Sequence, residues 1–404
     1  MEESEMVEGW KNYCLKEIID ELIMGQSPDS SSYNNEEKGI AFIQGNADMQ
    51  NGVPSIRMFT TDPKRYSELN DILLSVRAPV GDVFYNNYGN LSIGRGLSAI
   101  RIKNKHLRTL VYYWLKFDKK QFERLEQGTT FTEIGKKEVR NINVTIPTNS
   151  KEQASIANIL SKVDEAIESV KKSIAAAEKL KKSLMQNLLT GRMKPDGTLR
   201  KDDEFYVDEK FGKVPIGWEV KKLGNLFHIK AGGDLQENFY SPIYDEQHKC
   251  PIFSNTIENS GLYGYTSNPR FISKESLTIV GRGVGVGHVE YRKGNYDAII
   301  RLISLIPKQE DAINCMYVNY YICQYVHFAI ESTGVPQLTC PKVFSTKIII
   351  PKNVFEQSQI AEKIHCIDID IKIKQNQIIT LEHLKKSLMQ NLLTGKVRVW
   401  GSGK

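Results

Sequence analysis

Cysteine and histidine are too scattered in this sequence to form the usual metal sites. The 404 residues include six cysteines and seven histidines. No two cysteines form C-x-x-C, no histidine stands four residues from another, and no acidic cluster joins them. The spacing therefore predicts no metal site, and it favours free thiols in a reducing compartment.

Long apolar segments are also missing. No run of about 18 consecutive apolar residues occurs, which is the length that a transmembrane helix needs. The chain starts with an acidic segment, MEESEMVEGWK, where a secretory signal would be basic and then apolar. We therefore expect no membrane span, no secretory signal and a cytoplasmic location.

Motifs for catalysis are absent too. The sequence has no G-x-x-x-x-G-K-[ST], no N-P-P-[FY] or D-P-P-Y, and no F-x-G-x-G. The glycines at 281, 283, 285 and 287 lead into HVEY, which favours a strand and a turn over a dinucleotide-binding helix. PD at 28–29 followed by EEK at 36–38 resembles a nuclease motif, but the segment is short and polar. We predict a binding protein with no catalytic residues.

The overall composition is that of a globular protein. Hydrophobic residues make up 40% of the chain and charged residues 25%, and the net charge is +6. The length predicts two or three domains. The small positive excess is compatible with a polyanionic partner but does not establish one.

One internal repeat organises the chain. Residues 181–191 and 385–395 both read KKSLMQNLLTG. The match extends backwards without a gap to an Ile-Pro pair at 146–147 and at 350–351, and GWKNYCL (9–15) is weakly similar to GWEVKKL (217–223). The plan is therefore a variable segment followed by a repeated element, twice over.

The repeated element has the pattern of a long helix. Apolar residues alternate at steps of three and four, which is typical of a coiled-coil seam. Lys181, Lys374 and Lys385 interrupt this pattern. The predicted seam residues are Ile156, Leu160, Val163, Ile167, Ile174, Leu184, Leu188, Ile360, Ile364, Ile367, Ile371, Ile378, Leu388 and Leu392.

The ends of each repeated element carry helix signals. Asn149 with Glu152, and Asn353 with Glu356, have capping-box spacing, and a glycine at 191 and at 395 follows the last leucines. Each helix should contain about 40 residues and extend about 60 Å. We expect the two copies to pair within the chain, although an exposed spacer or an intermolecular coiled coil would show the same pattern.

These observations predict an α+β protein with pseudo-two-fold symmetry, in which two long antiparallel coiled-coil helices separate and join two mixed α/β domains. Helical stretches are expected at 107–117 and 316–326. The predicted divisions are a first domain at 1–147, a central helix at 148–192, a linker at 193–212, a second domain at 213–351 and a distal helix at 352–399.

This plan resembles the specificity subunits of type I restriction–modification enzymes. GWEVKKLG (217–224), the Ile-Pro before each helix and the two KKSLMQNLLTG copies carry the resemblance. GWKNYCLKEI in the first half departs from it, because the usual Leu-Gly is missing. The resemblance implies that each domain recognises one half of a bipartite, asymmetric DNA target.

The resemblance also implies partners and cofactors. Two methyltransferase subunits would carry S-adenosylmethionine and methylate adenine, and two restriction subunits would use ATP and Mg. This chain would bind none of these cofactors. The predicted docking residues for the methyltransferases are Met185, Gln186, Asn187, Met389, Gln390 and Asn391, although a recent duplication would also explain the identity of the two copies.

Base recognition in DNA needs Arg, Gln, Asn or His on loops that enter the major groove. The predicted DNA contacts of the first domain are Gln26, Ser27, Arg57, Arg77 and Arg95. Those of the second domain are Gln236, Asn255, Arg270, Arg282, His288 and Arg292. A contact with phosphate, or a plain surface charge, is the alternative for each residue.

Three other functions remain open from the sequence. A specificity subunit of a type IIB restriction–modification system would have the same plan but a fused nuclease–methyltransferase partner. A free-standing methyltransferase or nuclease would need the motifs that are missing. A coiled-coil adaptor without DNA binding would not need two divergent domains bounded by identical helices.

Overall fold

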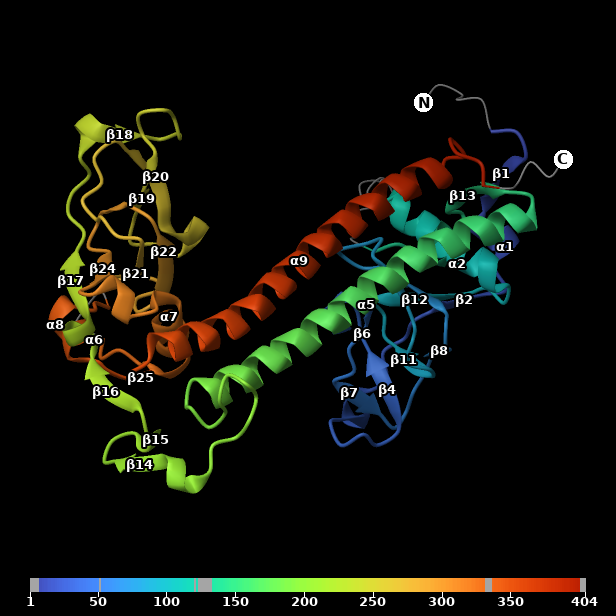
Figure 1. The fold of residues 1–404 in the computed structure, drawn as a ribbon. Helices are drawn as coiled ribbons and strands as arrows, with labels where there is room; N and C mark the ends of the chain where they lie inside the picture. The colour runs from blue at the N-terminus through green and yellow to red at the C-terminus, as the bar shows by residue number, and fades with distance from the viewer. Residues whose placement is uncertain (1–6, 51, 120, 123–132, 331–335, 400–404) are drawn as a thin grey trace. The chain divides into compact units, whose positions relative to one another are not determined.

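The computed structural model describes residues 7–50, 52–119, 121–122, 133–330 and 336–399. The chain forms two compact units (Figure 1). The first unit contains residues 1–172 and 376–404, and the second contains residues 173–375. Each unit therefore combines one mixed domain with the start of one long helix and the end of the other. No helix within the described part of the chain is long and apolar enough to cross a membrane.

The first domain is built from short strands and a few helices. Two strands pair antiparallel where the domain meets its long helix, namely β1 (Trp10–Cys14) and β13 (Asn143–Pro147). One sheet has the order β10 (Val83–Tyr85), β9 (Ile72–Ser75), β12 (Leu97–Arg101), β2 (Glu21–Met24). Another has the order β3 (Tyr33–Asn34), β7 (Met58–Thr60), β4 (Ile40–Ile43), β11 (Leu91–Ile93), β8 (Tyr66–Ser67). The remaining elements are the pair β5 (Met49–Gln50) and β6 (Val53–Pro54), and the helices α1 (Leu15–Ile18), α2 (Lys105–Phe117) and α4 (Lys136–Arg140).

The second domain repeats this plan. Its strands β16 (Trp218–Lys222) and β25 (Lys347–Pro351) pair antiparallel, as β1 and β13 do. One sheet has the order β17 (Phe227–Ala231), β24 (Ile303–Pro307), β21 (Glu275–Ile279), β22 (Val289–Lys293). Another has the order β18 (Tyr240–Ser241), β20 (Leu262–Thr266), β19 (Cys250–Phe253), β23 (Asp297–Ala298). The helices are α6 (Leu223–Leu226), α7 (Cys315–Tyr325) and α8 (Cys340–Ser345).

Helices α2 and α7 begin at equivalent caps. The Asn104 side chain accepts hydrogen bonds from the first backbone N–H groups of α2, and the Asn314 side chain accepts one from the Tyr317 N–H of α7. An asparagine at this position satisfies backbone donors that have no partner inside the helix. The predicted helical stretches at 107–117 and 316–326 are therefore confirmed, with α7 ending at Tyr325.

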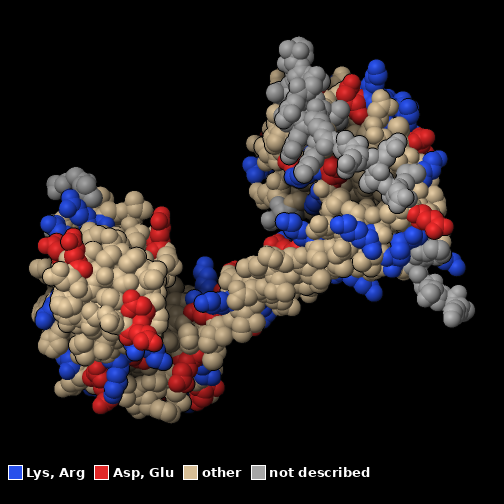
Figure 2. Space-filling model, turned by 90° about the horizontal axis from the view of Figure 1, so that it is seen from above, with Lys and Arg blue, Asp and Glu red and all other residues tan. Residues whose placement is uncertain are grey.

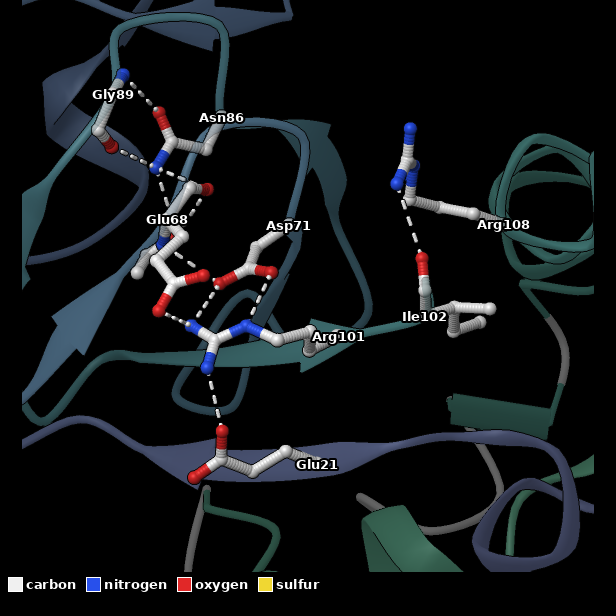
Figure 3. A network of polar contacts seen from close by, with 9 residues as sticks. Glu21, Glu68, Asp71, Asn86, Gly89, Arg101, Ile102 and Arg108 are labelled. Atoms are coloured by element: carbon white, nitrogen blue, oxygen red, sulfur yellow. Dashed lines mark hydrogen bonds and ion pairs between the residues drawn. The ribbon is translucent and has the colours of Figure 1, made fainter. Parts of the chain in front are cut away.

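A charged network ties the edge of the first domain together (Figure 3). The Arg101 guanidinium donates to both carboxylate oxygens of the buried Asp71, over 3.1 and 3.0 Å, and lies 2.6 Å from a Glu21 oxygen. It also lies 3.2 Å from a Glu68 oxygen. The buried Asn86 side chain donates to the Glu68 carbonyl and to Gly89. These contacts fix the segment between β8 and β9 on the sheet, because each buried polar group has a partner.

Two long helices of equal length follow the domains. They are α5 (Ser150–Leu188) and α9 (Val354–Leu392). In the first unit the start of α5 packs with the end of α9, so that Ile156 and Leu160 share a core with Leu392. In the second unit Ile360 and Ile364 share a core with Leu188. The start of one helix beside the end of the other makes the pair antiparallel, and the predicted α+β class with this helix arrangement is confirmed.

Burial along the seam varies with position. The buried seam residues are Ile156, Leu160, Val163, Ile167, Leu188, Ile360, Ile364 and Leu392. The half-buried seam residues are Ile174, Leu184, Ile367, Ile371, Ile378 and Leu388. The helix ends are covered because the mixed domains pack over them, and this adds apolar surface that a two-helix pair alone does not provide.

The lysines that interrupt the seam form ion pairs. In the first unit Lys385 Nζ of α9 lies 2.6 Å from Asp164 Oδ1 of α5, and the Tyr113 hydroxyl of α2 donates to Asp164 Oδ2 over 2.7 Å. In the second unit Lys181 Nζ lies 2.5 Å from Asp368 Oδ1, and the Tyr320 hydroxyl donates to Asp368 Oδ2 over 2.7 Å. Burial, and then the nearby carboxylate, raise the pKa of both tyrosines. Lys374 instead pairs with Asp370 on its own helix.

The segment expected to be a linker is folded. Residues 193–212 contain β14 (Phe205–Asp208), which pairs with β15 (Gly212–Pro215). Arg200 from this segment binds Glu356 at the start of α9, and the Trp218 indole N–H donates to the same carboxylate over 3.1 Å. The first unit has a matching contact, since Arg398 binds both oxygens of the fully buried Glu152 over 2.7 and 3.0 Å. Each long helix is therefore anchored at its start by an arginine from the segment after the other helix.

Replacing Glu152 with alanine should lower the free energy of unfolding by about 2 kcal/mol, because a buried charge pair loses one member. Urea denaturation followed by circular dichroism would measure the change. Glu165→Ala, on the exposed face of the same helix, is the matched control and should change stability by less than about 0.5 kcal/mol. Equal effects of the two substitutions would contradict the anchoring role of Glu152.

Candidate nucleic-acid interface

Two chain segments meet at one end of the β21–β24 strand pair in the second domain. Residues 280–282 follow β21, and residues 299–302 precede β24. A Cβ atom on Gly281 would lie 2.7 Å from the Arg301 carbonyl oxygen, so the backbones approach closely here. Together with parts of two other loops they line a hollow of about 480 Å³, whose lining residues are Gly232, Gly233, Asp234, Asn255, Arg282, Ile300 and Arg301.

Asn255 fixes the backbone on one side of this hollow. Its Oδ1 accepts a hydrogen bond from the Gly281 N–H over 2.7 Å, and its Nδ2 donates to the Arg282 carbonyl. Both ends of the amide are therefore engaged by the protein backbone. We accordingly assign Asn255 a positioning role in place of the base contact predicted from the sequence.

The glycine run after Arg282 forms consecutive turns. Gly283, Gly285 and Gly287 have φ values of 85°, 84° and 89°, a region that residues with a side chain rarely adopt. The N–H of His288 donates to the Gly285 carbonyl, and the N–H of Gly287 donates back to Val280. The run is a tight loop that returns the chain to β22, and it does not have the strand–helix form of a dinucleotide-binding site.

Two exposed arginines stand at the hollow, Arg282 and Arg301. Neither guanidinium forms an ion pair or a side-chain hydrogen bond with any residue that the structure describes. Ile300 and Arg301 both have positive φ, at 54° and 62°. Non-glycine residues rarely adopt this conformation, and it is often found at binding sites.

Arg301 was missed by the sequence analysis, although the first domain contains its counterpart. Leu97 and Leu302 occupy equivalent places, because each accepts a hydrogen bond at its carbonyl from a glycine N–H after β2 or β17. Arg95 and Arg301 lie just before them. The signal in the sequence was an arginine shortly before the leucine, in IGRGLS (93–98) and IIRLIS (299–304), although Arg95 stands two residues before Leu97 and Arg301 one residue before Leu302.

The first domain brings four of its predicted residues close together. The Gln26 N–H donates to the Ile93 carbonyl, and the Arg95 N–H donates to Ser27 Oγ over 3.3 Å. The N–H of Val76, next to Arg77, donates to Gly96. Gln26, Ser27, Arg77 and Arg95 therefore lie around one site. Arg57 is exposed in the segment between β6 and β7.

Arg77 and Arg282 are equivalent residues with different partners. Each forms a β-bridge, Arg77 with Glu133 and Arg282 with Gln337. The Arg77 guanidinium also forms an ion pair with the Glu133 carboxylate over 2.8 Å. Glutamine at 337 carries no charge, so the equivalent position in the second domain leaves Arg282 without such an ion pair.

Two predicted DNA contacts are structural residues instead. Arg270 binds both carboxylate oxygens of the buried Asp297 over 2.6 and 2.9 Å, and it also donates to the Ala298 carbonyl. Arg292 is 7% exposed and donates to Thr278 Oγ1, with its guanidinium 3.7 Å from the Phe253 ring centroid. Burial lowers the pKa of Arg292. These contacts hold both guanidinium groups against the domain, and Arg292 is the more buried of the two.

The remaining predicted contacts of the second domain have partners within it. Gln236 Oε1 accepts from the Asn268 amide over 3.2 Å. His288 Nε2 lies 3.1 Å from Glu290 Oε1. Figure 2 shows lysine and arginine side chains interspersed with acidic ones on the face in view. The face in view therefore carries mixed charge.

The two KKSLMQNLLTG copies do not present the same surface. Met389 and Gln390 line a hollow of about 500 Å³ in the first unit, together with Lys116 and Phe117. Met185, the counterpart of Met389, is 8% exposed and belongs to the core of the second unit. The docking role of Met185 stays a prediction, and its side chain is covered by the second domain.

The other predicted docking residues are equivalent in the two copies. Gln186 and Gln390 are both exposed. The amides of Asn187 and Asn391 each donate to the serine carbonyl four residues earlier, over 2.8 and 3.0 Å. Of the predicted docking residues, the glutamines are therefore the pair that is exposed at both copies.

A family model described as the Type I restriction modification DNA specificity domain matches residues 7–179 and 215–383. The chain belongs to this family. The match covers both mixed domains and most of both long helices. The resemblance found in the sequence is thereby confirmed.

Three similar proteins illustrate the range of this family. The putative type I restriction enzyme MjaX specificity subunit of Methanocaldococcus jannaschii is 41% identical over 192 residues, which cover 47% of this chain and 45% of that protein. The type I restriction enzyme MjaVIII specificity subunit of the same organism is 25% identical over 414 residues, covering 97% and 94% of the two chains. The S subunit of a type I restriction–modification system from M. genitalium has the same fold, with a TM-score of 0.63, 17% identity, and coverage of 95% and 96%.

Substituting Asn255 with alanine should loosen the loop that carries Arg282, because two backbone groups lose their partner. Hydrogen–deuterium exchange at the Gly281 N–H should accelerate about fivefold to tenfold, as expected for the loss of one hydrogen bond. Asn238→Ala, an exposed asparagine in the same domain, serves as the control. Unchanged exchange at Gly281 would refute the positioning role.

Proposed function

We propose that this chain is the non-catalytic, DNA-reading specificity subunit of a cytoplasmic type I restriction–modification complex. Each mixed domain would act as a target-recognition domain for one half of a bipartite, asymmetric target. The observation that carries the proposal is the recurrence of an arginine pair, Arg77 with Arg95 and Arg282 with Arg301, at equivalent strand ends of two divergent domains. Arginine is the side chain that most often makes specific contacts with base edges.

The helix pair supports a second part of the proposal, the docking of two methyltransferase subunits. The chain repeats the same sequence at the end of each long helix and keeps Gln186 and Gln390 exposed at both copies. A quasi-two-fold scaffold suits two copies of one partner. S-adenosylmethionine would be held by the methyltransferases, and ATP and Mg by two restriction subunits, so the chemistry would take place on the partners.

Methylome sequencing of cells carrying the complete system would test the reading of DNA. We expect a bipartite adenine-methylation motif that disappears when the gene for this chain is deleted. Exchange of residues 213–350 for the corresponding domain of another family member should change one half of the motif only, because each domain has its own core. A motif that persists without the gene would reject the function, and an exchange that altered both halves would reject independent reading.

The combined substitutions Gln186→Arg and Gln390→Arg should weaken assembly with the methyltransferase. Both side chains are exposed, so the lone subunit should keep its thermal stability, while two large charges obstruct both proposed docking surfaces. Native mass spectrometry should show loss of the species with two methyltransferases. Gln377→Arg, exposed on α9 outside the repeated segment, is the control and should assemble normally. Full retention of the complex by the double variant would reject this docking surface.

A further inference from the structure

The hollow of the second domain contains groups of both signs. Arg282 and Arg301 supply donors, and Asp234 is the carboxylate among its lining residues. The Asp234 backbone carbonyl accepts a hydrogen bond from Arg270 over 3.0 Å, and Arg270 is itself held by the buried Asp297. The segment that carries Asp234 is thus fixed to the interior of the domain.

The arginines are also held at their backbones. Asn255 binds the Arg282 carbonyl, and the N–H of Ile300, next to Arg301, donates to the Gly233 carbonyl over 3.1 Å. The guanidinium groups remain exposed and without a partner among the described residues. Fixed backbones with unpaired donors are the arrangement expected of a recognition site, because little ordering is needed on binding.

We infer that this hollow recognises a guanine–cytosine base pair through its major-groove edge, an inference that rests on the proposed DNA-reading function. Guanine presents two acceptors, O6 and N7, that match the two parallel donors of an arginine. Cytosine presents the N4 amino group, which donates to a carboxylate. Arg282 or Arg301 would bind the guanine, and Asp234 would accept from the cytosine.

The Asp234 carboxylate favours a base pair over a phosphate as the ligand of this hollow. A phosphate would gain from both arginines but would be repelled by Asp234, since like charges at short range oppose binding. A guanine–cytosine edge satisfies both signs at once. The hollow is therefore better suited to a base-pair edge than to the DNA backbone.

The first domain differs at these same positions. Gly25 and Gly232 are equivalent by their hydrogen bonds to Leu97 and Leu302, so Ser27 corresponds to Asp234. Ser27 Oγ accepts from the Arg95 backbone, and Arg77 is neutralised by Glu133. The equivalent site in the first domain thus has no carboxylate at this place and only one unpaired arginine. We therefore expect substitutions of Arg282, Arg301 and Asp234 to change the base preference only in the half-site bound by the second domain.

Selection from a randomised duplex library, with the full chain in complex with its methyltransferase, would test the inference. The wild-type complex should enrich a bipartite motif with a fixed guanine–cytosine pair in one half. Arg282→Gln or Arg301→Gln should reduce the preference for that pair by about tenfold or more, the usual effect of losing a bidentate contact, and leave the other half unchanged. Asp234→Ala should also relax the preference, because it removes the acceptor that the cytosine N4 amino group needs.

Arg192→Gln is the matched control, since Arg192 is exposed in the same unit but does not line the hollow. It should leave the motif intact. Variants whose binding weakens equally on all sequences would show phosphate contacts and overturn the inference, while the proposed function would stand. A motif with no guanine–cytosine pair sensitive to these residues would overturn it as well. A wild-type complex that enriches no motif would instead reject the proposed function.

Discussion

The pairing of one lysine and one aspartate across the two long helices is the interaction on which the architecture depends. In each unit the carboxylate receives a lysine from the other helix and a tyrosine hydroxyl from the adjacent mixed domain. One half-buried carboxylate therefore joins two long helices and a helix of the mixed domain. A hydrophobic seam alone permits sliding and exchange of partners, whereas a charge pair with one geometry specifies register.

The sequence pattern predicts the repeat, the helices and their antiparallel pairing, because these depend on local periodicity and on identity between the copies. It treats Lys181 and Lys385 as interruptions, since their partners Asp368 and Asp164 lie 187 and 221 residues away in the sequence. Partners that are brought together only by folding also explain why the sequence indicated DNA contacts at Arg270 and Arg292. Arg270 and Arg292 have the residue type of a DNA contact, but their partners come from strands that only the folded domain brings near.

Equivalent positions in the two domains have the same backbone contacts and different side chains. The bridges of residues 77 and 282, and the turns before Leu97 and Leu302, are alike. Gln337 stands in the second domain where Glu133 stands in the first, and Asp234 stands where Ser27 does, so the charge at each site differs. The two domains therefore present different groups at the same strand ends, while their helix anchors are alike.

Arg200, in the segment after α5, and Arg398, in the segment after α9, make the same kind of contact. Each binds the glutamate at the start of the other long helix. Arg398 binds Glu152 and the Glu8 carbonyl, and Gly395 lies against Val7 and Trp10, so the last described residues return to the first. The two anchors join residues that are 156 and 246 positions apart in the sequence. Each anchor can therefore form only after the long helices have come together.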